Sequence, residues 1–593
     1  MSPKKRNIYT RILIWRYKHI SERQFVYLLS IIVGFLAGLG TTVLKYITLF
    51  IQSTLEGGII KNYHYSLYFI FPIIGVLLVY LIKRYLIKKE IGHGISTTLY
   101  SISKRSGIIE RYKMFASLIT APITAGFGGS VGLQGPAVST GAALGSNVAQ
   151  LFHMNTKTRM LLIGCATAGA MSSMFKAPVA AIIFAIEIFS LDLVFASLVP
   201  LLLASVAAVI TSYFFIGTDV LFGFELQDLW RVKDIAFYLL LGVGTGFASV
   251  YFSKMYFFIT SFFNRFSNAY AKIGIAAVAI GLMLYLIPPL YGEGYGLINN
   301  LLNGDTAAAL SDIPYNINFD NVWMVISMLL IIVVFKAIAM TTTFAAGGVG
   351  GIFIPTLFMG SALGNVFAKI INQFGFDVSE SNFTLIGMTG LMAGVLHAPL
   401  TAIFLIAEIT GGYDLFVPLM LVATISYGLT KYFVSNSIYT AELAKRGELI
   451  TNDRDKNALM MMRIDKIIET NFVPLQPDMS LREMLREGVS KSNRNLFPVL
   501  DETGQFLGIV LLDDVRPIMF DQKLYDTTKV SEFMKSAPDI IFYNDSMETI
   551  MEKFKGSGAW NLPVIKEKKY IGFISKSKLL TAYRNKLIEV TTS

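Results

Sequence analysis

Charged residues are scarce in this sequence. Only 15% of the 593 residues are Asp, Glu, Lys or Arg, while 54% are hydrophobic. A soluble globular protein has about 25% charged residues. The deficit excludes an ordinary soluble domain for most of the chain and indicates a membrane protein with several spanning segments.

Cysteines and clustered acids are also nearly missing. Cys165 is the one cysteine of the sequence, and it lies in an apolar run, so an intrachain disulfide framework is excluded. The apolar part of the chain contains no acidic cluster, which leaves few ligands for a cation. We therefore expect no metal site, no required cofactor and no enzymatic activity.

Positive charge is in excess, with a formal net charge of +11. Much of it lies in residues 1–23, which hold seven Lys or Arg residues and a single acid, Glu22. This segment lacks the short apolar core and cleavage site of a signal peptide. The positive-inside rule places it in the cytoplasm. We interpret its charge as membrane-surface charge and expect no nucleic-acid partner.

Composition divides the chain into five parts: a basic N-terminus (1–24), an apolar membrane domain (25–440), a charged linker (441–462) and two segments of soluble composition (463–525 and 526–593). Some apolar runs are long enough to cross a bilayer, whereas others are short and interrupted by Gly and Pro. Broken helices are tolerated at membrane depth where they line a cavity or bind a ligand. We expect an all-α polytopic membrane domain in which many helices do not span.

An internal repeat organises the apolar part, with halves of about 25–216 and 235–440. GPAVSTGAALG matches IPTLFMGSALG in the spacing of its proline and two glycines, and KAPVAAIIFAIEI (176–188) matches HAPLTAIFLIAEI (397–409). The two matches are displaced by 219 and 221 residues. Matched broken helices in two halves indicate a substrate site at their interface. The pattern alone does not show whether the halves are inverted.

Glycine-rich segments precede matched apolar helices in both halves: GLQGP (132–136) and GGIFIP (350–355). Helix N-termini offer unpaired N–H groups and a favourable dipole to an anion. These segments therefore predict helix starts that face an anion. The alternative is that the glycines only allow close helix packing.

Four motifs, in this order, resemble the CLC family of chloride channels and proton-coupled chloride antiporters over about residues 25–445. GHGIS (92–96) resembles the family's GSGIP, GLQGP resembles G(K/R)EGP, GGIFIP resembles GxFxP, and Tyr439 resembles the pore tyrosine. The pathway motif residues carried over are Gly92, Gly94, Gly132, Gly135, Pro136, Gly351 and Pro355.

The resemblance implies a homodimer in which each subunit has its own anion pathway between inverted halves. By position, the backbone amides of Phe353 and Ile354 and the hydroxyl of Tyr439 would coordinate the central anion. The alternative is that Phe353 and Tyr439 are packing aromatics. Tyr439 also argues against the fluoride-exporting branch, which lacks this tyrosine.

Gln134 stands where the family has its gating glutamate. In the family that carboxylate competes with chloride when ionised and carries a proton when neutral. Glutamine has nearly the same shape but does not titrate. The resemblance therefore implies a gate without proton chemistry, whose amide donates a hydrogen bond to a passing anion.

Ile188 stands where proton-coupled members often have an internal proton acceptor. Isoleucine cannot relay a proton, although some antiporters of the family also lack this acid. The preceding Glu187 is either a substitute acceptor or a structural residue. We favour the structural interpretation because Glu408 holds the same position in the second half.

His93 replaces the pore serine, and Ser96 replaces the proline that follows in the family motif. His93 is either a structural residue or an anion-binding donor that becomes charged at mildly acidic pH. Serine at this position is usually associated with chloride and proline with nitrate. The choice among chloride, bromide and nitrate therefore stays open.

The soluble segments contain a second repeat with strand–helix–strand–strand–helix patterning, which resembles a pair of CBS domains (463–525 and 526–593). Such pairs often bind adenine nucleotides. Here the matching polar positions are incomplete, since the first copy keeps Asp514 and the second keeps Ser575. A nucleotide site and a dimerising scaffold without nucleotide both remain open.

Together these features predict a passive, proton-uncoupled chloride channel of the CLC type. The alternatives are a chloride–proton antiporter with an unrecognised proton path and a non-conducting membrane sensor that works through its CBS pair. The compact N-terminus and the absence of long inserted loops indicate a bacterial inner membrane, with the N-terminus and the CBS pair cytoplasmic.

Overall fold

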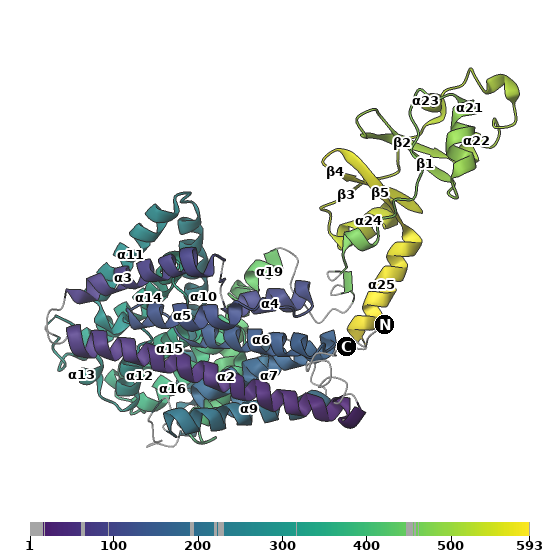
Figure 1. The fold of residues 1–593 in the computed structure, drawn as a ribbon. Coiled ribbons are helices and arrows are strands. Elements are labelled where there is room, and N and C mark those ends of the chain that lie inside the picture. The colour runs from purple at the N-terminus through teal and green to yellow at the C-terminus, as the bar shows by residue number, and fades with distance from the viewer. Residues whose placement is uncertain are drawn as a thin grey trace. The chain divides into compact units, whose positions relative to one another are not determined.

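The computed structural model describes residues 16, 18–60, 66–89, 91–92, 94–189, 195–218, 222, 230–315, 317–445, 455, 458–459 and 462–591. The chain forms two compact units, Met1–Leu449 and Ile450–Ser593 (Figure 1). His93 lies outside the described residues.

The first unit is built from helices. Its first half contains α2 (Glu22–Gln52), α3 (Leu67–Leu81), α4 (Gly94–Arg105), α5 (Lys113–Gly126), α6 (Gln134–Leu151), α7 (Thr156–Phe175), α8 (Pro178–Phe189) and α9 (Phe195–Ile216). Its second half contains α10 (Ile235–Asn264), α11 (Ala269–Leu286), α12 (Tyr295–Leu302), α13 (Thr306–Ala309), α14 (Val322–Ala345), α15 (Phe353–Gln373), α16 (Glu380–Leu396), α17 (Pro399–Ile409), α18 (Phe416–Phe433) and α19 (Ala441–Lys445). Short helical turns are η1 (Ser53–Ile60), η2 (Ile82–Ile87), η3 (Val232–Asp234) and η4 (Pro288–Leu290).

Eight helical segments among the described residues are long and apolar enough to cross a bilayer: Glu22–Glu56, Leu67–Ile87, Ser197–Ile216, Val232–Asn264, Ala269–Leu286, Val322–Ala345, Phe353–Gln373 and Phe416–Phe433. Two further apolar helices, α8 and α17, are shorter. The predicted mixture of spanning and broken helices is therefore present.

The two halves repeat the same packing. In the first half α2 packs along α7 and α9, and α6 packs on α7. In the second half α10 packs along α16 and α18, and α15 packs on α16. α11 lies beside α3 at one edge of this unit (Figure 1).

Reciprocal hydrogen bonds relate the halves by a local two-fold. The N–H of Ser130 donates to Thr343 Oγ1 at 3.3 Å, and the N–H of Val349 donates to Thr124 Oγ1 at 3.0 Å. Thr343 is the counterpart of Thr124 in the repeat, and Val349 is the counterpart of Ser130. The same contact is therefore made twice with the halves exchanged, as in an isologous interface. The repeat seen in the sequence is thus a structural one.

The second unit contains two small sheets. Strands β1 (Leu496–Leu500) and β2 (Phe506–Leu511) are antiparallel, and Leu475 adds a parallel bridge to Val499. β3 (Ile541–Phe542) runs parallel to β4 (Asn561–Lys566), which is antiparallel to β5 (Lys569–Ser575). The helices and helical turns are η5 (Ile464–Lys466), α21 (Leu481–Glu483), η6 (Met484–Gly488), η7 (Val489–Lys491), α22 (Leu512–Val515), η8 (Gln522–Leu524), α23 (Val530–Phe533), α24 (Met547–Ser557) and α25 (Lys576–Thr591).

Each sheet covers its own apolar core. Leu481, Phe497 and Val510 are buried in the first, and Ile550, Val564 and Ile574 are buried in the second. The same order of parallel and antiparallel neighbours occurs twice, which confirms the predicted α/β pair.

Candidate anion pathway

Two glycine-rich loops pair at the centre of the first unit. The N–H of Gly132 donates to the carbonyl of Gly351 at 2.9 Å, and the N–H of Gly351 donates to the carbonyl of Gly132 at 2.7 Å. α6 and α15 begin two residues after these glycines. Because first-turn N–H groups have no acceptor within their own helix, this bridge brings two anion-attracting helix starts together.

A third helix start, that of α4, joins them through glycine contacts. A Cβ on Gly94 would lie 2.9 Å from the carbonyl oxygen of Gly135, and a Cβ on Gly351 would lie 2.7 Å from the nitrogen of Gly135. Only hydrogen fits in these gaps. Gly92 has a φ of 72°, which favours glycine. Backbone thus packs on backbone where α4, α6 and α15 meet.

Both motif prolines lie in the first helical turn. Pro136 is the third residue of α6, and Pro355 is the third residue of α15. A proline has no N–H, and in the first turn that N–H would have no intrahelical acceptor. The prolines therefore begin these helices without loss of a hydrogen bond.

A small cavity lies at the meeting point, lined by Gly94, Ser96, Gly135, Gly351, Ile352 and Tyr439, among others. Tyr439 is only 6% exposed, and its hydroxyl has no hydrogen-bond partner in the described part of the chain. Buried polar groups in folded proteins nearly always have a partner. The structure therefore brings three of the motif glycines, Gly94, Gly135 and Gly351, and Tyr439 to one cavity.

Phe353 and Ile354 lie directly after this cavity and are fully buried. The ring of Phe353 packs 5.2 Å from that of Phe175 and 6.2 Å from that of Phe184, measured between centroids. Its side chain is a packing aromatic, while its backbone N–H lies in the first turn of α15. Ile352, which the sequence reasoning passed over, lines the cavity instead.

Gln134 is the first residue of α6 and is fully buried. Its Nε2 donates to the hydroxyl oxygen of Tyr295 at 3.1 Å, whereas its Oε1 has no partner among the described residues. Tyr295 in turn donates to Glu293 Oε1 at 3.4 Å, and the N–H of Leu133 donates to the same oxygen at 3.0 Å.

Glu293 was not anticipated from the sequence. It is 8% exposed and lies near two cations, Lys336 on α14 and Lys45 on α2, which interact with it electrostatically. Lys336 is fully buried, and its Nζ donates to the carbonyls of Gly292 at 3.2 Å and Leu290 at 3.4 Å. The available signal was a lysine within an apolar span and an acid within YGEGYG, because ionisable residues in membrane segments mark functional sites by default.

The two repeat glutamates cap helices of the opposite half. Glu187, on α8, accepts from the N–H groups of Leu400 and Thr401 at 3.2 and 2.8 Å. Glu408, on α17, accepts from the N–H groups of Val179 and Ala180 at 3.2 and 2.9 Å. A carboxylate at a helix N-terminus satisfies orphan donors and the helix dipole. These contacts agree with the structural interpretation of Glu187, and Ile188 follows it on α8.

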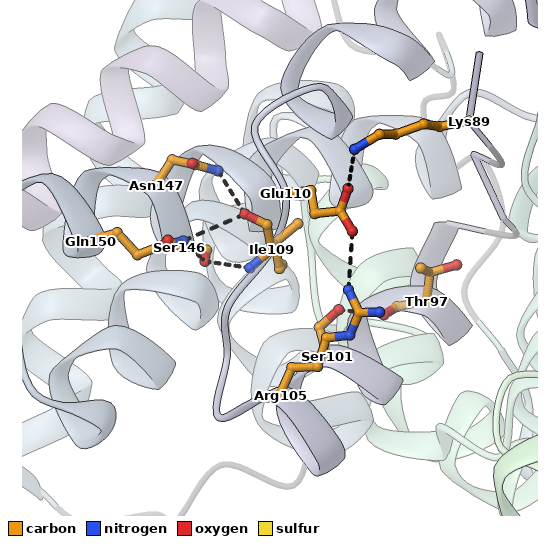
Figure 2. A network of polar contacts seen from close by, with 9 residues as sticks. All are labelled: Lys89, Thr97, Ser101, Arg105, Ile109, Glu110, Ser146, Asn147 and Gln150. Carbon is orange, nitrogen blue, oxygen red and sulfur yellow. Dashed lines mark hydrogen bonds and ion pairs between the residues drawn. The ribbon is translucent and has the colours of Figure 1, made fainter. Parts of the chain in front are cut away.

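The loop between α4 and α5 ties α4 to α6 (Figure 2). The N–H of Ile109 donates to Ser146 Oγ at 3.0 Å, and its carbonyl accepts from Asn147 Nδ2 at 3.1 Å. Glu110 pairs with Lys89 at 2.8 Å and with Arg105 at 3.2 Å. Hydrogen bonds from Lys89 and then Arg105 lower the pKa of Glu110. The loop thus holds together two of the helices that begin at the cavity.

In the second unit, Asp514 and Ser575 lie in different copies of the repeat. Asp514, on α22, pairs with Lys535 at 2.7 Å. Ser575, at the end of β5, accepts from the N–H of Lys578 at 3.3 Å through its hydroxyl oxygen. Both side chains therefore have protein partners.

The model of the voltage gated chloride channel family matches residues 74–431. The chain belongs to this family. The CBS domain model matches twice, at residues 464–520 and 530–585. This voltage-gated chloride channel family member is therefore an integral, multi-pass membrane protein with two CBS domains.

Curated relatives carry two kinds of name. The chain is 26% identical over 388 residues to a ClcB-like chloride channel protein of Ralstonia nicotianae, covering 63% of this chain and 85% of that protein. It is 29% identical over 308 residues to the H(+)/Cl(-) exchange transporter ClcA of Vibrio cholerae, covering 50% of this chain and 62% of that protein. The match thus spans less than two thirds of the exchange transporter.

A solved eukaryotic CLC transporter has the same fold. It superposes with a TM-score of 0.58 at 17% identity and covers 93% of this chain and 97% of its own. At this identity the likeness establishes the fold alone, including the helical membrane domain and the CBS pair.

Proposed function

We propose that this protein is a passive, proton-uncoupled anion channel of the CLC type, with chloride as the expected anion. The observation that carries the proposal is Gln134 at the start of α6, fully buried beside a bridge between the two halves. An amide at this point neither titrates nor carries charge. It cannot act as a proton carrier or as an ionised block.

The anion would bind in the cavity at the start of α15. The unpaired hydroxyl of Tyr439 supports this, because it supplies a donor that no described protein acceptor uses. The backbone N–H groups of Phe353 and Ile354 lie in the first turn of α15 and would be further hydrogen-bond donors to the anion. His93, between Gly92 and Gly94, is proposed as a fourth donor to the pathway.

The lack of proton coupling has a second support on α8. Ile188 offers no titratable group, and the carboxylate of Glu187 is engaged by the N–H groups of Leu400 and Thr401. Both oxygens of this carboxylate are engaged as the cap of α17. Glu187 is therefore committed to a structural contact and not free to move between a proton donor and a proton acceptor.

Assembly, orientation and regulation complete the proposal. We propose a homodimer in a bacterial inner membrane, with each subunit holding its own pathway and with the N-terminus and CBS pair in the cytoplasm. The domain limits are proposed as 25–440 for the membrane domain, 463–525 for the first CBS domain and 526–593 for the second. We also propose that Asp514 and Ser575 contact an adenine nucleotide.

A chloride–proton antiporter is the second candidate function. It is favoured by Glu293, a buried acid that is joined to Gln134 through Tyr295. A relative named an exchange transporter adds to this support. Such a protein would use a proton path that includes neither Gln134 nor Ile188.

The test uses purified protein in liposomes with an outward chloride gradient, following chloride efflux and external pH together. The channel proposal expects chloride efflux with the pH trace of protein-free liposomes and a reversal potential indifferent to a pH gradient. Protons driven uphill by the chloride gradient would establish the antiporter instead. Absence of transport of chloride, bromide and nitrate would leave the CBS-based sensor as the better account.

A further inference from the structure

Glu293 brings a carboxylate to the start of α6 from a different segment of the chain. Its Oε1 accepts from the N–H of Leu133 at 3.0 Å, and Leu133 is the residue directly before the first residue of α6. That N–H is a donor that an anion at this helix start would use. Glu293 therefore occupies it as a tethered anion.

The surrounding loop is fixed to both halves. The hydroxyl of Tyr291 donates to the carbonyl of Gly126 at 2.9 Å, and Lys336 holds the carbonyls of Leu290 and Gly292. A Cβ on Gly294 would lie 3.6 Å from Lys336 Nζ. Glu293 is thus held in place by its backbone neighbours and does not belong to a free loop.

Glu293 interacts electrostatically with lysines from both halves. The groups are the ammonium of Lys45 on α2 and that of Lys336 on α14. Burial of charge is costly unless it is paired. The lysines therefore favour an ionised Glu293, whereas its burial favours the neutral form.

While Glu293 is ionised, it is fixed which group donates and which accepts in each of these hydrogen bonds. An ionised carboxylate only accepts, so the hydroxyl of Tyr295 must donate to Glu293 and its oxygen accepts from Gln134 Nε2. This arrangement occupies one of the two N–H groups of Gln134 Nε2 and leaves its buried Oε1 without a partner among the described residues. The occupied N–H is then withheld from an anion.

Neutralising Glu293 would reverse this arrangement. A neutral carboxyl group no longer requires the Tyr295 hydroxyl as a donor, so that hydroxyl can turn to the unpaired Gln134 Oε1. The N–H of Gln134 Nε2 that Tyr295 held is then available to an anion. The Leu133 N–H faces a neutral oxygen, which accepts more weakly than a carboxylate and which an anion can displace. One proton on Glu293 would thus loosen two donors at the helix start.

We propose that Glu293 is a positioning carboxylate that controls the anion pathway from outside the gate motif. Ionised, it holds the Leu133 N–H and, through Tyr295, the Gln134 amide; neutral, it releases both to a permeating anion. The proposal rests on the proposed function of the α6 start as part of the pathway. It makes Glu293 a fixed switch and not a carrier of protons across the membrane.

The groups facing Glu293 set its response to pH. Burial is the largest influence and raises the pKa of Glu293. The Leu133 N–H, Lys45 from α2, the Tyr295 hydroxyl from α12 and Lys336 from α14 oppose it by favouring the ionised form. Glu56 of η1 interacts electrostatically with Tyr291, which precedes Glu293 in the same loop. Acidification therefore drives Glu293 toward its neutral, releasing form.

The test measures chloride efflux from liposomes and chloride binding by calorimetry from neutral to mildly acidic pH. Wild type is expected to conduct and bind chloride about tenfold better at the acidic end, about the worth of one hydrogen bond to a charged group. Glu293→Gln is expected to match acidic wild type at every pH. Tyr295→Phe, which keeps the charge, is expected to free the Gln134 amide alone and to show a smaller pH response.

Glu380→Gln is the matched control. Glu380 lies in the first turn of α16 and, like Glu293, has a lysine nearby, since Lys369 Nζ donates to its Oε2 at 2.7 Å. Lys369 lies about 24 Å along α15 from its start at about 1.5 Å per residue. This variant is expected to keep the wild-type pH profile.

The outcomes separate the two proposals. A wild type that carries no chloride, or that drives protons uphill, overturns the channel function. A conducting wild type whose pH profile is unchanged in Glu293→Gln and Tyr295→Phe overturns the role of Glu293 and leaves the channel function standing. A monodisperse Glu293→Gln protein that conducts less than wild type at acidic pH overturns that role as well.

Discussion

The starts of α6 and α15 are counterparts in the two repeats, yet they differ in chemistry. Their backbones are bridged symmetrically through Gly132 and Gly351. The first side chain of α6 is Gln134, which joins a polar chain leading to Glu293, whereas its counterpart on α15 is Phe353, which packs among aromatic rings. The repeat therefore gives the two helix starts the same backbone arrangement, and the different residue types at positions 134 and 353 make them chemically different.

The caps of α8 and α17 show the opposite outcome. Glu187 and Glu408 accept from matched pairs of N–H groups across the local two-fold at similar distances. Glu187 accepts in addition from Thr401 Oγ1 at 2.6 Å. Structural positions kept their symmetry because both halves need the same cap. The first residues of α6 and α15 lost it, since Gln134 joins a polar chain and Phe353 packs among aromatic rings.

The largest expected effect comes from Gln134→Glu, which deepens the asymmetry. A carboxylate beside the helix start would bind its N–H groups and exclude an anion. We expect chloride efflux at neutral pH to fall by about 100-fold, near the upper range for a hydrogen bond to a charged group, and to recover on acidification. Gln134→Met, similar in length and uncharged, is the control. Unchanged efflux and pH response in the Glu variant would contradict the placement of Gln134 at the gate.

The next effect comes from Gly351→Ala, which breaks the backbone bridge itself. The added methyl group would lie 2.7 Å from the nitrogen of Gly135, and such overpacking costs about 1–3 kcal/mol. We expect a lower unfolding temperature and reduced efflux. Gly428→Ala, within α18 and with no heavy atom within 4 Å of the added carbon, should instead be neutral or slightly stabilising. Equal melting temperatures for the two variants would argue against the close approach.

A smaller effect is expected for Tyr439→Phe, which removes one donor at the α15 side. Its hydroxyl has no described protein partner, so the loss leaves no buried group unpaired and stability should hardly change. Chloride affinity should fall about tenfold, the worth of roughly 1.4 kcal/mol. Calorimetry of chloride binding measures this. A loss of stability with unchanged affinity would make Tyr439 a packing residue.

The smallest effects are expected for Glu187→Gln and Glu408→Gln, made separately. Each removes the charge from one helix cap and should cost about 1 kcal/mol. The melting temperature should fall somewhat more for Glu187→Gln, because Glu187 also accepts from Thr401 Oγ1. Chloride efflux should stay free of proton movement in both. A change in proton movement in Glu187→Gln alone would show that this acid has a transport role that its counterpart lacks.

Local patterns in the sequence predicted much of the fold. Low charge and broken apolar runs predicted the helical membrane domain, and the spacing in GPAVSTGAALG and IPTLFMGSALG predicted the repeat. The start of α15 follows its glycine motif as predicted, as does the start of α6. These features were readable because helix starts, glycine turns and hydrophobic periodicity depend on residues close together in the chain.

The site was only partly readable. Gln134 and Tyr439 were found through motifs, but Ile352 and Glu293 were not. Ile352 is one apolar residue among many. Glu293 stands out as an acid, but its contacts with Leu133 and Tyr295 form only in the folded chain.

The sequence alone determined that this is a two-fold repeated, CBS-bearing membrane protein of the voltage-gated chloride channel family with a glutamine in its GLQGP segment. Only the tertiary structure decided what that amide contacts. Leu133 and Glu293 are 160 residues apart, and Gln134 and Tyr295 are 161 apart. Hydrogen bonds over such separations leave no periodic or local signal in the chain, since they form only when packed helices bring distant segments within about 3 Å.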